Sequence, residues 1–204
     1  AGMTINTNTG AIAWTPTEGQ GSNTYNVTVT VTDTSPQAVN AQQLSDTKFF
    51  TVTVTESNSP PRFTSVPGSQ IVTELSALNL TVSAADDDLP ANTLTYALVS
   101  PPAGMNINAG NGAITWTPAE VQGSNFYTIT VTVTDTNPAG INQKQFTITT
   151  NFTVTVNEAN SPPRFTSVPA NQIITELTAL NVSVTAADDD LPANPLTYAL
   201  VSPP

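Results

Sequence analysis

Carboxylate side chains are the groups in this sequence best suited to chemistry, and they recur at a fixed interval. Fifteen Asp and Glu residues stand against four Lys and Arg residues, which gives a formal net charge of -11. Every acidic residue except Asp46 occupies a position that repeats along the chain. Clustered carboxylates repel one another unless a cation lies among them, and Ca²⁺ takes about 6–8 oxygen ligands from converging loops. Recurrence alone proves little because the repeats are so similar, but carboxylates that the fold brings together could hold calcium.

Composition excludes several other kinds of chemistry. The chain has no His and no Cys, so neither a Ser/His/Asp triad nor a disulfide can form, and almost all zinc sites are excluded. The scarcity of positive charge argues against nucleic-acid binding and against binding to an anionic membrane surface. No apolar run approaches the length of a membrane span. We expect the protein not to be an enzyme.

The sequence repeats with an offset of 102 residues, from the segment that begins at Asn58 to the one that begins at Asn160. The two linker motifs, Asn-Ser-Pro-Pro-Arg-Phe, are identical, and no gap is needed anywhere. A unit of this size suits a β-sandwich domain. We therefore divide the chain into the C-terminal part of a first repeat (1–57), a complete second repeat (58–159) and the N-terminal part of a third (160–204).

Alternation of apolar and polar residues predicts antiparallel strands within each repeat. It is clear over 78–82, 94–98, 127–133 and 152–156, and a period of two means one buried and one solvated face. Gly110 and Gly112 lie in a predicted hairpin turn. These features predict an all-β chain of tandem seven-stranded Greek-key β-sandwiches of the cadherin-like or immunoglobulin-like kind.

Two further local features can be read in the complete repeat. Thr117-Pro118-Ala119-Glu120 is typical of a capping box with proline at the first helical position, which predicts a single helical turn. Trp116 and its counterpart Trp14 each end an alternating strand, so we expect core positions rather than sugar-stacking platforms. Tyr127 and Tyr25 stand where a tyrosine corner is expected.

Several motifs together resemble the cadherin-like repeats of bacterial proteins and of dystroglycan. They are Asp-Leu-Pro-Ala-Asn-Thr-Leu-Thr-Tyr (88–96), Pro-Ala-Gly-Met (102–105), Gly-Ala-Ile-Thr-Trp-Thr-Pro (112–118) and the Asn-Glu-Ala-Asn-Ser-Pro-Pro linker (157–163). The resemblance covers the whole chain and implies calcium held between successive domains. Because Asn157 and Asn160 stand where Asp is usual, it implies one or two weak sites at each junction rather than three.

The resemblance also implies which residues would hold the ions. The loop with Asp86–Asp88 and the strand end at Asp135 would face the preceding repeat, and other acids would lie at the opposite pole. The first junction would use Glu18, Glu56, Asn58, Asp86, Asp88 and Asp135. The second would use Glu74, Glu120, Glu158, Asn160, Asp188 and Asp190. Asp87 and Asp189 would point the other way.

Simpler explanations exist for the same acids. The Asp86–Asp88 run could be a solvated turn that keeps a Thr/Val-rich sheet soluble. Glu120 is explained by the capping box alone, and Glu74 could be an ordinary strand charge.

Two classes of function remain open. The leading hypothesis is a structural repeat of an extracellular stalk or filament on a bacterial surface, adhesin-like and stiffened by calcium. The alternative is a glycan-binding or homophilic adhesion module, whose specificity would vary in the divergent segments 37–49 and 139–151. An enzyme would need paired carboxylates in a cleft, which sandwich poles do not offer without a partner.

Residues 1–57 and 160–204 hold complementary parts of one sandwich. We therefore expect copies of the chain to meet end to end, either as one longer covalent array or as subunits that donate strands to one another.

Overall fold

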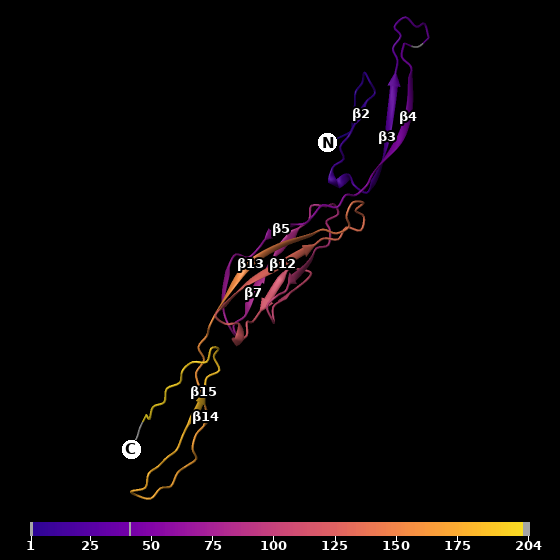
Figure 1. Cartoon of the computed structure of the whole chain (residues 1–204). Coiled ribbons are helices and arrows are strands. Elements are labelled where there is room, and N and C mark those ends of the chain that lie inside the picture. The colour runs from indigo at the N-terminus through magenta and orange to yellow at the C-terminus, as the bar shows by residue number, and fades with distance from the viewer. Residues whose placement is uncertain (1, 41, 202–204) are drawn as a thin grey trace. The chain divides into compact units, whose positions relative to one another are not determined.

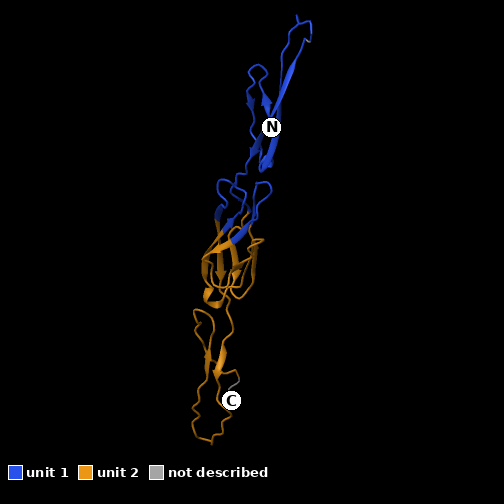
Figure 2. Cartoon of the chain, turned by 90° about the vertical axis from the view of Figure 1, so that its right-hand side faces the viewer, with its two compact units in different colours: residues 1–64, 83–96, 132–149 blue, residues 65–82, 97–131, 150–204 orange. Residues whose placement is uncertain are grey.

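A computed structural model describes residues 2–40 and 42–201. The chain divides into two compact units, which Figure 2 colours separately: residues 1–64, 83–96 and 132–149, and residues 65–82, 97–131 and 150–204. Residue 1 and residues 202–204, which the sequence analysis assigned to the first and third repeats, lie outside the described residues. No helix within the described ranges is long and apolar enough to cross a membrane.

The complete repeat contains nine strand segments. They are β5 (Arg62–Ser65), β6 (Gln70–Thr73), β7 (Leu78–Thr81), β8 (Ser83–Ala85), β9 (Thr95–Val99), β10 (Asn106–Ile107), β11 (Ala113–Trp116), β12 (Asn125–Thr134) and β13 (Thr147–Asn157). Their sheets have the orders β6-β13-β12-β9, β10-β11-β7 and β5-β8. Segments β5 and β6 are two parts of one strand, as are β7 and β8, so the repeat has the seven strands of an immunoglobulin-like sandwich. The predicted fold class is confirmed.

Strand β6 pairs with β13 in parallel, from Gln70 opposite Val154 to Thr73 opposite Asn157. The other recorded pairings are antiparallel, including β10 with β11 across the predicted glycine turn. Strand β5 pairs with β8, and β6, which follows β5 in the chain, pairs with β13.

Alternation along these strands builds the core of the second unit. Ile129, Val131, Val154 and Val156 on β12 and β13 are almost wholly buried, and Ile114 on β11 is equally inaccessible. Residues between them in sequence face outward, as the period of two requires. Trp116 is buried as expected, donates its indole N–H to the Ala103 carbonyl at 3.1 Å, and meets Tyr127 edge to face.

The partial repeats show the same local structures. Residues 2–57 contain β1 (Thr4–Ile5), β2 (Ile12–Ala13), β3 (Asn23–Thr32) and β4 (Ser45–Val54). Strands β3 and β4 run side by side as one long hairpin (Figure 1), and threonine hydroxyls pair across it. Residues 160–201 contain β14 (Arg164–Ser167) and β15 (Thr185–Ala187).

The predicted capping box is wrong in detail. The helical turns are η1 (Glu18–Gln20) and η2 (Glu120–Gln122), both 3₁₀, so η2 begins at Glu120 and not at Pro118. The carbonyl of Pro118 accepts the Leu75 N–H at 2.8 Å, and the backbone stays extended through Ala119. The carboxamide of Gln122 accepts the Ala119 N–H. The carboxylate of Glu120 therefore takes no part in capping this turn.

Both tyrosines make the predicted corner. The Tyr25 hydroxyl donates to the Gln20 carbonyl at 3.1 Å, and the Tyr127 hydroxyl donates to the Gln122 carbonyl at 3.3 Å. Each bond joins a long strand to the helical turn before it. The two turns, which carry Glu18 and Glu120, are thereby fixed against β3 and β12.

Candidate metal centres

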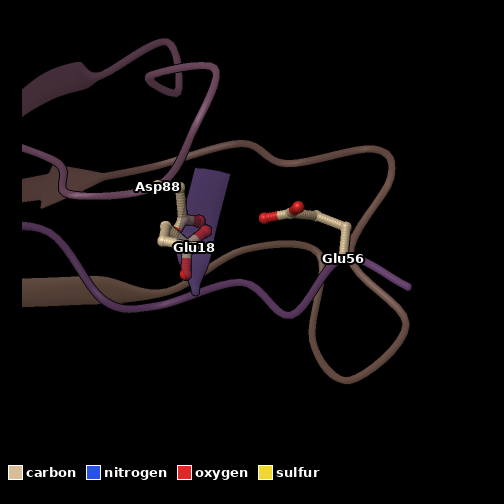
Figure 3. Close-up of side chains that lie close together, drawn as sticks. All are labelled: Glu18, Glu56 and Asp88. Atoms are coloured by element: carbon tan, nitrogen blue, oxygen red, sulfur yellow. The ribbon is translucent and has the colours of Figure 1, made fainter. Parts of the chain in front are cut away.

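Three carboxylates from distant parts of the sequence meet within the first unit. Glu18 lies in η1, Glu56 follows β4 and Asp88 follows β8, and one oxygen of each lies within 4.8 Å of the others. Figure 3 shows the Glu56 carboxylate pointing toward those of Glu18 and Asp88. Glu56 and Asp88 are buried, while Glu18 is exposed. We call this set the first cluster.

The other residues predicted for this junction surround the first cluster. Asp135 is fully buried, and its Oδ2 accepts a hydrogen bond from Asn58 Nδ2 at 3.1 Å. Asp86 Oδ1 accepts the backbone N–H of Asp88 at 3.0 Å. The second oxygen of Asp86 is buried without a hydrogen-bond partner.

A second cluster of carboxylates lies within the second unit. Glu74 follows β6, Glu120 begins η2 and Glu158 follows β13, and these carboxylates also lie within 4.8 Å of one another. Glu74 is only 1% exposed, so its position is not that of an ordinary strand charge. Glu74 Oε2 and both oxygens of Glu158 are buried without hydrogen-bond partners.

The predicted residues that follow the second linker lie at the same end of this unit. Asp190 is buried and accepts the Ser161 N–H at 2.9 Å, while its own N–H binds Asp188 Oδ1. Glu120 Oε1 accepts the Leu191 N–H at 3.0 Å. Asn160 is exposed and accepts a hydrogen bond from Asn194. Each linker is therefore followed by the same arrangement of backbone and aspartate.

Two aspartates point away from the clusters, as the sequence predicted. Asp87 and Asp189 are exposed and form two-point ion pairs with Arg62 and Arg164, with closest contacts of 2.8 and 3.0 Å. The hydrogen bond from Arg62 lowers the pKa of Asp87. These two carboxylates are charged surface groups and are not part of either cluster.

Burial without a counter-cation raises the pKa of several cluster carboxyls. Desolvation is the main cause for Glu56, followed by the charge of Glu18. Desolvation also raises the pKa of Asp86, opposed by its backbone hydrogen bonds. In the second cluster, desolvation and then the Glu74 carboxyl raise the pKa of Glu158 to about 7. Both clusters therefore favour a positive charge among them, whether a proton or a metal ion.

Beside each cluster, a carboxylate occupies the space that the side chain of any residue larger than glycine would fill. A Cβ on Gly123 would overlap Glu74 Oε2 and lie 2.6 Å from Glu158 Oε2. A Cβ on Gly21 would overlap Glu56 Oε2. Both glycines have negative φ, so close approach, and not backbone conformation, explains the residue type.

Neutral amides complete the first cluster, and the sequence analysis did not name them. Asn92 Nδ2 lies 2.6 Å from Asp88 Oδ2, and Asn137 Nδ2 lies 3.2 Å from the same oxygen. Asn92 could have been found, because it belongs to the Asp-Leu-Pro-Ala-Asn motif that recurs with Asn194. Asn137 gave no such signal, since its counterpart in the first repeat is Ser35.

The donor set of both clusters fits a hard divalent cation. Carboxylate oxygens are ligands that Ca²⁺ accepts, and the chain has no His or Cys to favour a softer metal. The unpartnered buried oxygens of Glu74, Glu158 and Asp86 are the groups that such an ion would satisfy. Burial of charged oxygens without a partner is otherwise costly.

We expect the stability of the cation-free protein to fall as pH rises. The folded-state pKa of Glu158 lies above its ordinary value of 4.5. Its contribution is therefore complete below that value and is lost as pH rises through about 7. Thermal unfolding in calcium-free buffer should give a lower melting temperature at pH 7.5 than at pH 4.5. Glu158→Gln should weaken this dependence, and an unchanged slope in that variant would contradict the assignment.

The fold and the repeat place the chain in a known class. Residues 1–55 and 60–157 match the family model described as "Putative Ig domain". The chain belongs to that family, and its modules are cadherin-like, immunoglobulin-like β-sandwiches. The resemblance found in the sequence is confirmed.

One solved structure supports the same fold. Mouse cadherin-23 EC22-24 matches with a TM-score of 0.53 at 19% identity, covering 88% of this chain and 57% of that one. Human CDH23 EC21-23 matches with a TM-score of 0.47 at 21% identity, covering 91% and 60%. The chain thus spans about six-tenths of the length of these two structures. No curated protein sequence matches it.

Proposed function

We propose that this chain is a run of structural repeats from an extracellular stalk or filament, stiffened by Ca²⁺ at the junctions between repeats. The observation that carries the proposal is that the carboxylates of the first cluster come from both sides of a linker. Glu18 and Glu56 precede the Pro60-Pro61 linker and Asp88 follows it, yet their oxygens lie within 4.8 Å. An ion held by all three would tie one repeat to the next.

The second junction repeats this design. Glu74, Glu120 and Glu158 precede the Pro162-Pro163 linker, while Asp190 follows it and its charge contributes to the raised pKa of Glu158. In each case the ion would replace repulsion between buried carboxylates by attraction. Two prolines in each linker restrict the backbone further.

Apolar residues that are exposed in the two partial repeats support end-to-end contact between copies. Val31 is 69% exposed, whereas its counterpart Val133 in the complete repeat is wholly buried. At the other partial repeat, Tyr198 is 54% exposed and its counterpart Tyr96 is 7% exposed. The inner faces of residues 2–57 and 160–201 are the two parts that pack together in the complete repeat. We propose that another copy of the repeat covers these faces in the assembled stalk or filament.

Small-angle X-ray scattering of the 204-residue chain tests the proposal. With calcium, we expect a narrow distribution of particle dimensions, and with chelator a broader one, because the junctions would lose their ions. A dilution series on the same samples reports end-to-end association of the 21.3 kDa chains. Identical scattering with and without calcium would contradict the stiffening role. Saturable glycan binding in such a sample would favour an adhesion module instead.

A further inference from the structure

Residues 136–146, in the loop between β12 and β13, bind the linker that precedes their own repeat. The Ile141 N–H donates to the Glu56 carbonyl at 3.1 Å. The side chain of Asn142 makes two hydrogen bonds to Asn58, donating Nδ2 to its carbonyl at 2.8 Å and accepting its N–H at 2.9 Å. These three bonds hold the linker backbone, and none of them involves a charged group.

The shape of this loop does not depend on the linker. Its closing bond, from the Asn137 N–H to the Lys144 carbonyl, is 2.9 Å long. In the first repeat the equivalent bond joins the Ser35 N–H to the Gln42 carbonyl, also at 2.9 Å. There Asn40, the counterpart of Asn142, is exposed. The loop is therefore formed locally, and its bonds to Glu56 and Asn58 are additional interactions.

The loop and the linker are in close contact at a glycine. A Cβ on Gly140 would lie 3.0 Å from the Cβ of Asn58, closer than such atoms normally approach. The first repeat has Ala38 at this position. A linker bound to that loop would have to shift by a few tenths of an ångström, so the two repeats would hold their linkers unequally.

The same loop also reaches the carboxylates. Asn137 is buried, and its Nδ2 lies 3.2 Å from Asp88 Oδ2 and 3.5 Å from Glu56 Oε1. One amide thus faces a carboxylate from each side of the linker. Because the linker backbone at Glu56 and Asn58 is held at the same time, the loop fixes the direction in which the Glu56 side chain leaves the chain.

We infer that the 136–146 loop is a cation-independent clamp on the linker, with Asn142 as its positioning residue. The clamp holds Glu56 and Asn58 in place before any ion binds, so the first cluster is preorganised. This inference deepens the proposed function, since it concerns the same junction. It stands separately from calcium binding, because the clamp consists of neutral hydrogen bonds.

Hydrogen exchange of individual amides in chelator tests the clamp. In Asn142→Ala we expect the Ile141 amide to exchange about ten-fold faster, because the neighbouring bonds to Asn58 are lost. The Phe146 amide, which donates to Asp135 Oδ1 at 2.5 Å within the loop's base, should exchange as in the parent chain. Gly140→Ala should accelerate Ile141 in the same selective way.

Gln143→Ala is the matched control, since that side chain bonds only to Gln145 within the loop, and it should leave both amides unchanged. Equal acceleration of Ile141 and Phe146 in Asn142→Ala would mean that Asn142 merely stabilises the loop, and would overturn the clamp. Unchanged exchange at Ile141 would overturn it too. Failure of calcium binding, measured separately, would contradict the proposed function and leave these outcomes unaffected.

Discussion

Calcium at 10 mM should raise the melting temperature of the complete repeat by about 5 °C or more. Extracellular calcium modules bind with dissociation constants of about 10⁻⁴ to 10⁻³ M, so this concentration is about 10- to 100-fold above Kd and stabilises by about 1.4–2.7 kcal/mol. For a domain of this size, each kcal/mol shifts the melting temperature by about 4–8 °C. Differential scanning calorimetry with and without a chelator measures the shift.

The double variant Asp86→Asn, Asp88→Asn should abolish most of that stabilisation at the first cluster. Both residues face the cluster, and Asp88 is 1% exposed. Asp87→Asn is the control, because it removes one negative charge from the same loop, from a carboxylate that is paired with Arg62 at the surface. If the three chains respond alike to calcium, the acidic loop is only a solvated turn.

Gly123→Ala should weaken calcium binding at the second cluster by about tenfold. The new methyl group would overlap Glu74 Oε2, so the buried Glu74 carboxylate would have to shift from the position in which it meets Glu120 and Glu158. Overpacking of this kind typically costs about 1–3 kcal/mol, and each 1.4 kcal/mol corresponds to about a tenfold change in affinity. Isothermal titration calorimetry resolves the loss.

Substitutions at two other glycines serve as controls for this measurement. Gly68→Ala should leave binding unchanged, because a Cβ added at Gly68 would meet no atom within 4 Å. Gly21→Ala should instead affect the first cluster, where its Cβ would overlap Glu56 Oε2. Equal affinities in the parent chain and Gly123→Ala would show that the space beside Glu74 is not part of an ion site.

The sequence predicted what depends on regular patterns. Alternation identified β12 and β13, and the position of Trp116 at the end of such a strand predicted its burial. Recurrent acids identified the residues that form both clusters, because Glu18 and Glu56 and then Glu74, Glu120 and Glu158 recur with the repeat. The closeness of these carboxylates in space could be predicted from the assumed sandwich, because the ends of its strands meet at its poles.

Features that depend on close approach could not be predicted. The need for glycine at 123 becomes visible only when Glu74 is placed beside it. Asn137 and Asn142 act through contacts with residues about 80 positions away, and Asn is too common in this chain for any one to stand out. The capping prediction failed because Pro118 had an unforeseen partner in Leu75, whose N–H its carbonyl accepts.

The parallel pairing of β6 with β13 has a mechanical consequence for a chain under tension. Force enters a repeat ahead of β6 and leaves after β13, so it pulls the two strands in opposite directions along their length. The bonds between 70–73 and 154–157, together with that from the Glu74 N–H to the Asn157 carbonyl, are then loaded in shear and must break together. An antiparallel pair pulled from one end would unzip one bond at a time. The complete repeat therefore has a pair of strands that resists shear, beside the residues that would bind the ion.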